Sequence, residues 1–224
     1  MKKGIKAAAH LHERVPAGWY FKSLKVNPTK WYWYPQWAWH NLRFMNVAGL
    51  VEPTGGVVLD VGCADGVFTK VVLDKSKAER VVGVDVLKDS IDWAEKHWKK
   101  EKRMEFMVAD GHKLPFKGAA FNAAFALEVL EHVADPGKVL KEIFRVLKPG
   151  GYAVFLVPSD SFLFKTLWYN FWTKTRGSVW DDTHIQSYAD NNLIKLAKKA
   201  GFRLEKNKKF ILGMLQVVKV RKNK

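Results

Sequence analysis

Five short apolar runs alternate with helical patterns through the middle of the chain, and this alternation constrains the fold more than any other feature. The runs are Val57–Val61, Val81–Val86, Met104–Ala109, Ala123–Leu127 and Tyr152–Val157. Continuous runs of this length, rich in β-branched residues, are typical of strands buried on both faces of a parallel sheet. The sequence therefore predicts repeated strand–helix units and an α/β fold.

Helical patterns occupy the intervals between these runs. The segment Ser90–Lys100 carries apolar residues at helical spacing, and a second helix begins after Asp135, its expected N-cap, and ends at Pro149-Gly150-Gly151. The apolar face of this second helix consists of Val139, Leu140, Ile143, Phe144 and Leu147.

The last part of the chain predicts one more helix and a hairpin. Ser187 and Asp190 resemble a capping box, and Gly201 closes the helix. Its buried stripe consists of Leu193, Ile194, Ala197 and Ala200. The runs Phe202–Glu205 and Phe210–Val220 then predict an antiparallel pair. We expect a Rossmann-like, doubly wound, seven-stranded sheet, mostly parallel with a C-terminal antiparallel hairpin and helices on both faces. Ligands of such sheets bind at the carboxyl ends of the strands.

A loop of small residues, Asp60-Val61-Gly62-Cys63-Ala64-Asp65-Gly66, follows the first run. Small residues let a backbone turn sharply and approach a ligand closely. A phosphate-binding P-loop would need Gly-Lys-Ser/Thr, which is absent, and a dinucleotide loop would need a glycine where Val67 stands. Two readings remain, a ligand-binding Gly-x-Gly-x-Gly-like turn with Ala64 in the middle place and a tight turn without a ligand.

Acidic residues end the first three runs. Asp85 closes the second run, 19 residues after Gly66, where a carboxylate can accept hydrogen bonds from both hydroxyls of a ribose or can cap the next helix. Asp110 closes the third run and could accept from the exocyclic amine of adenine. Acidic residues at three successive strand ends favour ligand binding over helix capping as their role.

Several motifs now resemble those of class I methyltransferases that depend on S-adenosylmethionine (SAM). The resemblance covers roughly residues 55–158 and is closest to the small-molecule and lipid-precursor branch, known as type 11, which includes the quinone-biosynthesis methyltransferases. The matching segments are Val57–Gly66, Val82–Asp85, Ala109–Phe116, Glu128–Val133 followed by Asp135-Pro136, and Arg145–Gly151. Two positions depart from the family pattern: Ala64 replaces a glycine, and Asn122 replaces an aspartate beside Phe121.

The resemblance implies SAM as the cofactor. The loop would contact the methionine end, Asp85 would hold the ribose, and Asp110 would hold adenine with His112 or Leu114 beside the ring. Val86 and Leu87 would pack on the adenine face. The expected binding residues are Asp60, Gly62, Cys63, Ala64, Gly66, Asp85, Val86, Asp110, Gly111, His112 and Leu127.

The acceptor side offers three candidate catalytic residues, His132, His184 and Glu128. A general base is needed only for an acceptor that arrives protonated. His132 could instead orient its loop, and His184 could instead bond the start of the following helix. Glu128 stands where the methyl group should point. Arg43 is a candidate partner for the carboxylate of SAM, and the alternatives are Arg14 or no arginine at all. No Cys/His cluster indicates a metal.

Charge and aromatic residues bear on the partners. The net charge is +16, and residues 195–224 hold 11 Lys or Arg against one acid, Glu205. Such a surface attracts RNA, DNA or an anionic membrane face, or serves solubility. The single cysteine, Cys63, and the lack of an apolar run of about 18 residues favour a cytoplasmic protein.

Two aromatic segments flank the central domain. Residues 1–50 form a basic extension rich in Trp and Tyr, and residues 159–182 form an aromatic insertion in the domain 51–224. We expect these segments to form a lid. The alternatives are an interfacial surface on an anionic membrane or a base-stacking surface for RNA. The interfacial reading would use the neighbouring lysines Lys22, Lys25, Lys30, Lys165 and Lys174.

The sequence therefore predicts methyl transfer from SAM to a small or lipid-linked acceptor, with peripheral membrane contact. RNA methylation and a non-catalytic SAM-binding module are the alternatives, and the oligomeric state stays open.

Overall fold

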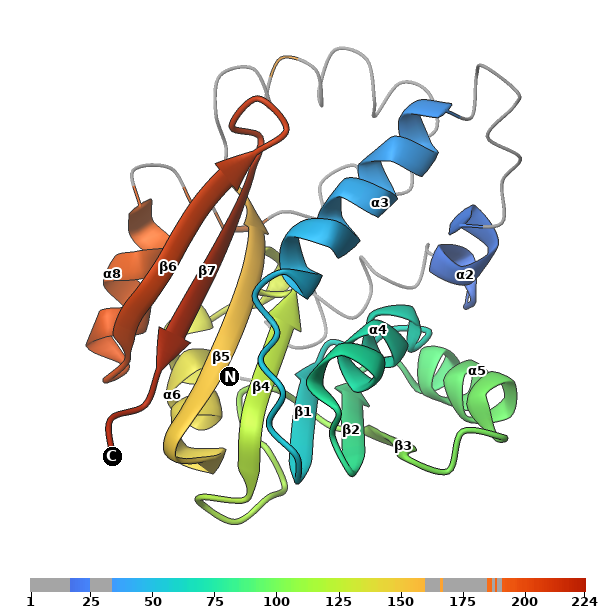
Figure 1. Ribbon diagram of the computed structural model, residues 1–224, viewed down its shortest axis with the longest axis horizontal. Coiled ribbons are helices and arrows are strands. Elements are labelled where there is room, and N and C mark those ends of the chain that lie inside the picture. The colour runs from blue at the N-terminus through green and yellow to red at the C-terminus, as the bar shows by residue number, and fades with distance from the viewer. Residues whose placement is uncertain (1–16, 25–33, 160–165, 167–184, 187, 189–190) are drawn as a thin grey trace.

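A computed structural model describes residues 17–24, 34–159, 166, 185–186, 188 and 191–224. Seven strands of this part form one sheet in the order β3-β2-β1-β4-β5-β7-β6 (Figure 1). Their bounds are β1 Val57–Val61, β2 Arg80–Asp85, β3 Met104–Val108, β4 Phe121–Leu127, β5 Leu147–Pro158, β6 Arg203–Phe210 and β7 Leu215–Arg221. The helices are α2 Trp19–Leu24, α3 Tyr34–Ala48, α4 Val67–Ser76, α5 Lys88–Trp98, α6 Pro136–Val146 and α8 Asn192–Lys199, with a 3₁₀ turn η1 at Leu130–His132.

The first five strands run parallel, and β7 runs antiparallel to both β5 and β6. The chain builds the sheet outward from β1 to β3 and then returns to place β4 on the other side of β1. In such a sheet the connections diverge between β1 and β4, and ligands of doubly wound sheets bind at the carboxyl ends of the strands at this point. The doubly wound sheet with its terminal hairpin is therefore confirmed.

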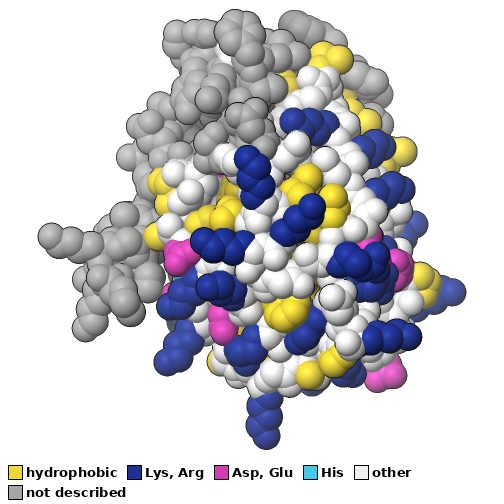
Figure 2. Space-filling view, turned by 90° about the vertical axis from the view of Figure 1, so that its left-hand side faces the viewer, with side chains coloured by type: hydrophobic (Ala, Val, Ile, Leu, Met, Phe, Trp, Pro, Cys, Tyr) yellow, Lys and Arg dark blue, Asp and Glu magenta, His cyan; other side chains and the backbone are white. Residues whose placement is uncertain are grey.

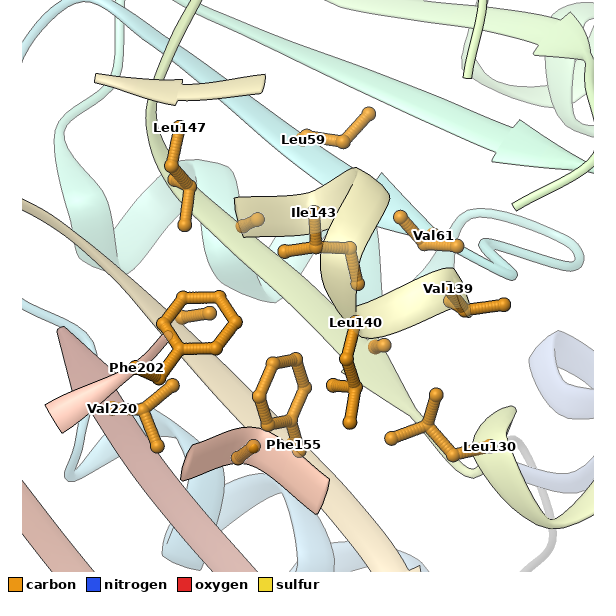
Figure 3. Packing of buried hydrophobic residues seen from close by; sticks show 14 of the residues in the cluster. Leu59, Val61, Leu130, Val139, Leu140, Ile143, Leu147, Phe155, Phe202 and Val220 are labelled. Carbon is orange, nitrogen blue, oxygen red and sulfur yellow. The ribbon is translucent and has the colours of Figure 1, made fainter. Parts of the chain in front are cut away.

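Helices cover both faces of the sheet. On one face, α6 and α8 pack on β4, β5 and β7, where Leu140, Ile143 and Phe155 are fully buried (Figure 3). On the opposite face, α3 and α4 pack on the central strands, including β1, β2, β4, β5 and β7. Val47 and Leu50 belong to this second cluster, so the end of the expected N-terminal extension contributes to the main core.

The expected helix after Asp135 is confirmed, and its cap has the predicted chemistry. The Asp135 side chain accepts a hydrogen bond from the Lys138 amide at 2.9 Å, and Pro136 is the first helical residue. The end differs from the expectation, because the helix stops at Val146 and β5 already begins at Leu147. Leu147 pairs with Phe121, so the Pro-Gly-Gly sequence lies within an irregular strand start.

The C-terminal elements differ from the expectation in extent. The first hairpin strand continues past Glu205 to Phe210, through polar residues that show no alternation with apolar ones. Pairing with β7 rather than a periodic pattern stabilises this part. Helix α8 begins at Asn192, and the expected capping residues Ser187 and Asp190 lie outside the described residues. Within the described ranges, no helix is long and apolar enough to cross a bilayer.

Candidate functional site

The loop between β1 and α4 is a tight turn that depends on small residues. Gly62, Ala64 and Gly66 have φ values of +73°, +47° and +76°, the left-handed region that favours glycine. A Cβ on Gly62 would lie 2.1 Å from Val129 Cγ2, and the Gly62 amide donates to the Val84 carbonyl at 2.7 Å. The residues at the neighbouring strand ends therefore hold the loop in one conformation, and Ala64 adopts a left-handed backbone conformation that favours glycine.

Asp85, at the end of β2, lies directly across this loop. Its Oδ2 accepts from the Ala64 amide at 2.9 Å, and its Oδ1 accepts from the Leu87 amide at 2.9 Å. Burial raises the pKa of the Asp85 carboxyl. The side chain stays partly exposed, and the next residue, Val86, is 44% exposed. The two amides hold the carboxylate in place beside an open apolar surface.

Asp60 and Cys63 lie beneath the loop and not on its open side. The Asp60 carboxyl is 1% exposed and accepts from the Thr69 hydroxyl at 2.6 Å. Burial, with a smaller contribution from Asp85, raises the pKa of Asp60 to about 7. Burial likewise raises the pKa of the Cys63 thiol. Their side chains support the loop from below, so only their backbone groups could reach a ligand on its open side.

His112 orients Asp110 at the end of β3. Asp110 Oδ1 accepts from the His112 amide at 2.8 Å and lies 2.7 Å from His112 Nδ1, while His112 Nε2 lies 3.3 Å from the Asp135 amide. A ring nitrogen that accepts the Asp135 N–H leaves the hydrogen on Nδ1, which donates to Asp110. Gly111 fits closely beneath, since a Cβ there would lie 3.2 Å from Val61. Leu114, the alternative to His112, packs in the core instead.

The end of β4 brings Glu128 together with Arg43 of α3. The Glu128 amide donates to the Leu156 carbonyl at 2.8 Å, and its φ is +58°. Arg43 is 3% exposed and donates from Nη1 to Glu128 Oε2, while its Nη2 contacts His40 Nδ1. Arg43 Nε is buried and has no hydrogen-bond partner in the described part of the chain. Leu127, one residue before Glu128, is buried.

The two histidines differ in what can be said of them. His132, at the end of η1, is 8% exposed, and its Nε2 lies 4.0 Å from Glu131 Oε1. The Glu131 carbonyl accepts from the amides of Ile185 and Gln186, so the turn η1 binds the backbone of the segment that follows residue 184. The burial of His132 fits the orienting role. His184 lies outside the described residues.

Asn122 lies at the other edge of the sheet, at the start of β4. Its Oδ1 accepts from the Val57 amide at 3.3 Å and from Lys148 Nζ at 3.0 Å. The side chain therefore joins the starts of neighbouring strands. Its departure from the family pattern does not touch the carboxyl edge.

One contact at the loop was not predicted from sequence. Asp65 Oδ2 accepts from the Phe21 amide of α2 at 2.8 Å, and the Asp65 carbonyl accepts from Trp98 Nε1 at 2.8 Å. The centre of the Phe21 ring lies 4.0 Å from the centre of the His97 ring and 5.5 Å from the centre of the Trp93 ring. The aromatic residues near the N-terminus were the available signal, but nothing local indicated where α2 would pack.

No group of three or more metal-ligating side chains occurs among the residues that the structure describes. The site therefore consists of hydrogen-bonding carboxylates, loop amides and one buried guanidinium.

Known proteins share this arrangement of elements. Residues 59–155 match the family described as a methyltransferase domain. A demethylmenaquinone methyltransferase of Bacillus licheniformis is 31% identical over 137 residues, which cover 60% of this chain and 57% of the relative. A tRNA (carboxymethyluridine(34)-5-O)-methyltransferase of Arabidopsis thaliana is 30% identical over 120 residues, which cover 51% of this chain and 28% of the relative. The chain thus spans less than two thirds of the length of either relative.

A solved structure extends the likeness to the fold. A putative methyltransferase from Bacillus halodurans has a TM-score of 0.63 and 20% identity, and the match covers 82% of this chain and 98% of that one. At this identity, the match shows a shared fold.

Proposed function

Residues 59–155 form a methyltransferase domain of the SAM-dependent family, and on this premise we propose that the chain transfers the methyl group of SAM to a small or lipid-like acceptor. The observation that supports this best is the Asp85 carboxylate, held across the glycine loop by the amides of Ala64 and Leu87. A carboxylate so fixed can accept from both hydroxyls of a ribose.

The neighbouring groups fit the remaining parts of SAM. Asp110, oriented by His112, would accept from the adenine amine, and exposed Val86 would offer an apolar face to the ring. The loop between Gly62 and Gly66 would lie beside the methionine end, while the amides of Gly62, Cys63 and Ala64 keep their bonds to Val84 and Asp85 and so fix the shape of the loop. Arg43, the sequence candidate for the carboxylate of SAM, would reach it only if the groups that cover its buried Nε moved aside.

The chemistry demands little beyond orientation. SAM supplies an electrophilic methyl group when it is bound. The chain must hold an acceptor in line with that group and exclude water, and orientation of this kind can supply up to about 7–11 kcal/mol. Glu128, fixed by Arg43 at the end of β4, can accept a hydrogen bond from an acceptor O–H or N–H and align it. Helices α2 and α3 lie beside the loop and serve as part of the expected lid.

Calorimetry with SAM tests the cofactor assignment. We expect Asp85→Asn to weaken SAM binding by about ten- to a hundredfold, because one or two hydrogen bonds to a charged group are weakened. Asp89→Asn, an exposed change in α5 with the same loss of charge, should leave the affinity unchanged. If wild-type protein binds neither SAM nor S-adenosylhomocysteine, the proposal is wrong.

A substitution at Glu128 tests the acceptor side. Glu128→Gln should lower turnover while SAM affinity stays within about threefold, because the side chain would act on the acceptor. A parallel fall in SAM affinity would place Glu128 in cofactor binding instead. A radiolabelled methyl screen over metabolites, lipid extract and RNA would identify the acceptor class.

RNA methylation is the second candidate. The observation that favours it is the basic character of α8 and β6, which carry seven Lys or Arg residues: Lys195, Lys198, Lys199, Arg203, Lys206, Lys208 and Lys209. Label incorporated into RNA and not into lipid or metabolite fractions would select this alternative.

A further inference from the structure

The turn between β6 and β7 lies at the same edge of the sheet as the proposed site. Phe210 pairs with Leu215, and Leu215 pairs with Pro158 at the carboxyl end of β5. The Ser159 amide donates to the Met214 carbonyl at 2.9 Å, and the Ser159 hydroxyl donates to the Gly213 carbonyl. The turn is therefore anchored just beyond β5, and Figure 1 shows it at the end of the sheet toward which β4 points.

This turn holds two branched apolar residues in an unfavourable backbone conformation, Ile211 packed against the core and Leu212 exposed. Ile211 and Leu212 have φ values of +50° and +52°, which glycine and asparagine adopt more easily than branched side chains. The Leu212 side chain is 82% exposed, so burial in the core does not account for it. An exposed branched residue held at a strained turn indicates a contact outside the fold.

Lysines surround the strand that leads to this turn. Lys206 and Lys208 project from one face of β6 and Lys209 from the other, because successive side chains of a strand alternate. At about 3.3 Å per residue, Lys208 and Lys209 stand within roughly 15 Å of Leu212. The acid of this strand, Glu205, is paired with Arg203 and Arg221. Figure 2 shows the side of the molecule that carries β6 and α8, where Lys and Arg side chains far outnumber Asp and Glu.

We propose that this turn, together with Lys206, Lys208 and Lys209, docks the protein on an anionic lipid surface. Leu212 enters the boundary between headgroups and acyl chains, and the lysines face the headgroup phosphates. RNA would attract the lysines equally but offers an exposed leucine no comparable partner. Because Glu128 bonds Leu156 two residues before Pro158, docking brings the lipid to the edge that holds the site. The inference rests on the proposed function in one respect, because docking would matter for catalysis only if the acceptor is lipid-like.

Co-sedimentation with vesicles tests the docking directly. We expect the intact chain to bind vesicles with about one third phosphatidylglycerol and to bind pure phosphatidylcholine weakly. Leu212→Asn, which also suits the turn conformation, should lower the partition coefficient by about tenfold. The double variant Lys208→Glu, Lys209→Glu should lower it at least about tenfold.

A second lysine pair supplies the matched control. Lys99 and Lys100 are adjacent and exposed. They lie between α5 and β3, and β3 is the outer strand on the side of the sheet opposite β6. Lys99→Glu, Lys100→Glu makes the same change in net charge and should leave vesicle binding within about twofold. An equal loss in both double variants would show a general charge effect and overturn the docking surface.

SAM calorimetry on the same variants separates the two proposals. Wild-type protein that binds SAM but not anionic vesicles contradicts the docking and leaves the methyltransferase proposal intact. Binding of RNA that falls with Lys208→Glu, Lys209→Glu, without vesicle binding, would also overturn it and assign the surface to nucleic acid. A failure to bind SAM would count against the proposed function alone.

Discussion

Ala64 has a backbone conformation that glycine adopts more easily. The glycine-like turn persists with alanine in its middle place, at a φ of +47°. A left-handed backbone conformation costs an alanine roughly 1–2 kcal/mol. Glycine avoids this cost, but part of the gain is offset because glycine loses more conformational entropy on folding. The loop therefore keeps its shape under strain, since the bonds to Val84 and Asp85 hold both sides of it.

Ala64→Gly should stabilise the protein. We expect the free energy of unfolding in urea to rise by about 0.5–1 kcal/mol, and the SAM dissociation constant should not rise. Ala119→Gly is the matched control, because Ala119 has a φ of +55° away from the site and should show the stability gain alone. A loss of stability in Ala64→Gly would contradict the left-handed conformation of this residue.

His40 predicts a dependence of stability on pH. Burial, with a smaller contribution from Arg43, lowers the pKa of His40 to about 2 in the folded protein, against 6.5 for a free side chain. Between these values the unfolded chain binds the proton and the folded chain does not. Stability from this residue is therefore present above pH 6.5 and lost as the pH falls, with a limiting slope of about 1.4 kcal/mol per pH unit.

His40→Gln isolates this contribution. Asp60, whose pKa is raised to about 7, acts in the opposite sense, because its folded form keeps a proton that the unfolded chain releases. The difference between wild type and His40→Gln cancels Asp60. Urea unfolding at pH 7.5 and pH 5 should show that acidification changes the free energy of unfolding less favourably in wild type than in the variant, by about 2 kcal/mol. The same change in both proteins would exclude His40.

At the scale of elements, short α2 is held beside the glycine loop by contacts with Asp65 and with α5. Asp65 binds the backbone of α2, and Phe21 packs on the aromatic residues of α5. A helix of six residues has little stability of its own, so tertiary contacts such as these decide whether it stays in place. Such an element can open without unfolding the sheet.

Phe21→Ala should release α2 while the sheet stays folded. Each ring contact contributes about 0.5–1.5 kcal/mol, so amide hydrogen exchange in residues 17–24 should accelerate by about ten- to a hundredfold. The midpoint of global unfolding should hardly change. Lys22→Ala, an exposed change in the same helix, is the control. Unchanged protection in Phe21→Ala would mean that other contacts hold α2.

At the scale of the whole molecule, a charged cluster joins the C-terminal hairpin to the segment before β1. Lys219 Nζ donates to the Leu50 carbonyl at 2.9 Å, pairs with Glu52, and lies 4.6 Å from the centre of the Tyr152 ring. Arg221 pairs with the same glutamate. The contacts of Lys219 with Leu50 and Glu52 span more than 160 residues of sequence, and they tie β7, which lies between β5 and β6, to the segment before β1.

Lys219→Met should destabilise the whole sheet in one cooperative transition. We expect a loss of about 1–3 kcal/mol in the free energy of unfolding, because the Leu50 carbonyl loses its donor and Glu52 loses one of two cations. Lys224→Met, an exposed change at the C-terminus, should stay within about 0.5 kcal/mol. A loss confined to the hairpin, seen by hydrogen exchange, would contradict a role in the whole sheet.

The sequence by itself determined the five parallel strands, the helix capped by Asp135, and the acids at the ends of β1, β2 and β3. These features are local, since strand burial, helix caps and turn residues leave their pattern within a few neighbouring positions. The part of β6 after Glu205 was not predicted, because its polar residues do not alternate with apolar ones. Pairing with β7 decides how far this strand extends.

Only the tertiary structure decided which side chains meet at the carboxyl edge. Arg43 meets Glu128 across 85 residues, Phe21 meets Asp65 across 44, and Asn122 proves to lie at the other edge, joined to Val57 across 65. No local pattern encodes such contacts, because they arise from how the helices pack on a completed sheet. The glycine loop could thus be predicted from its residues, while the groups beneath it and around it depended on the fold.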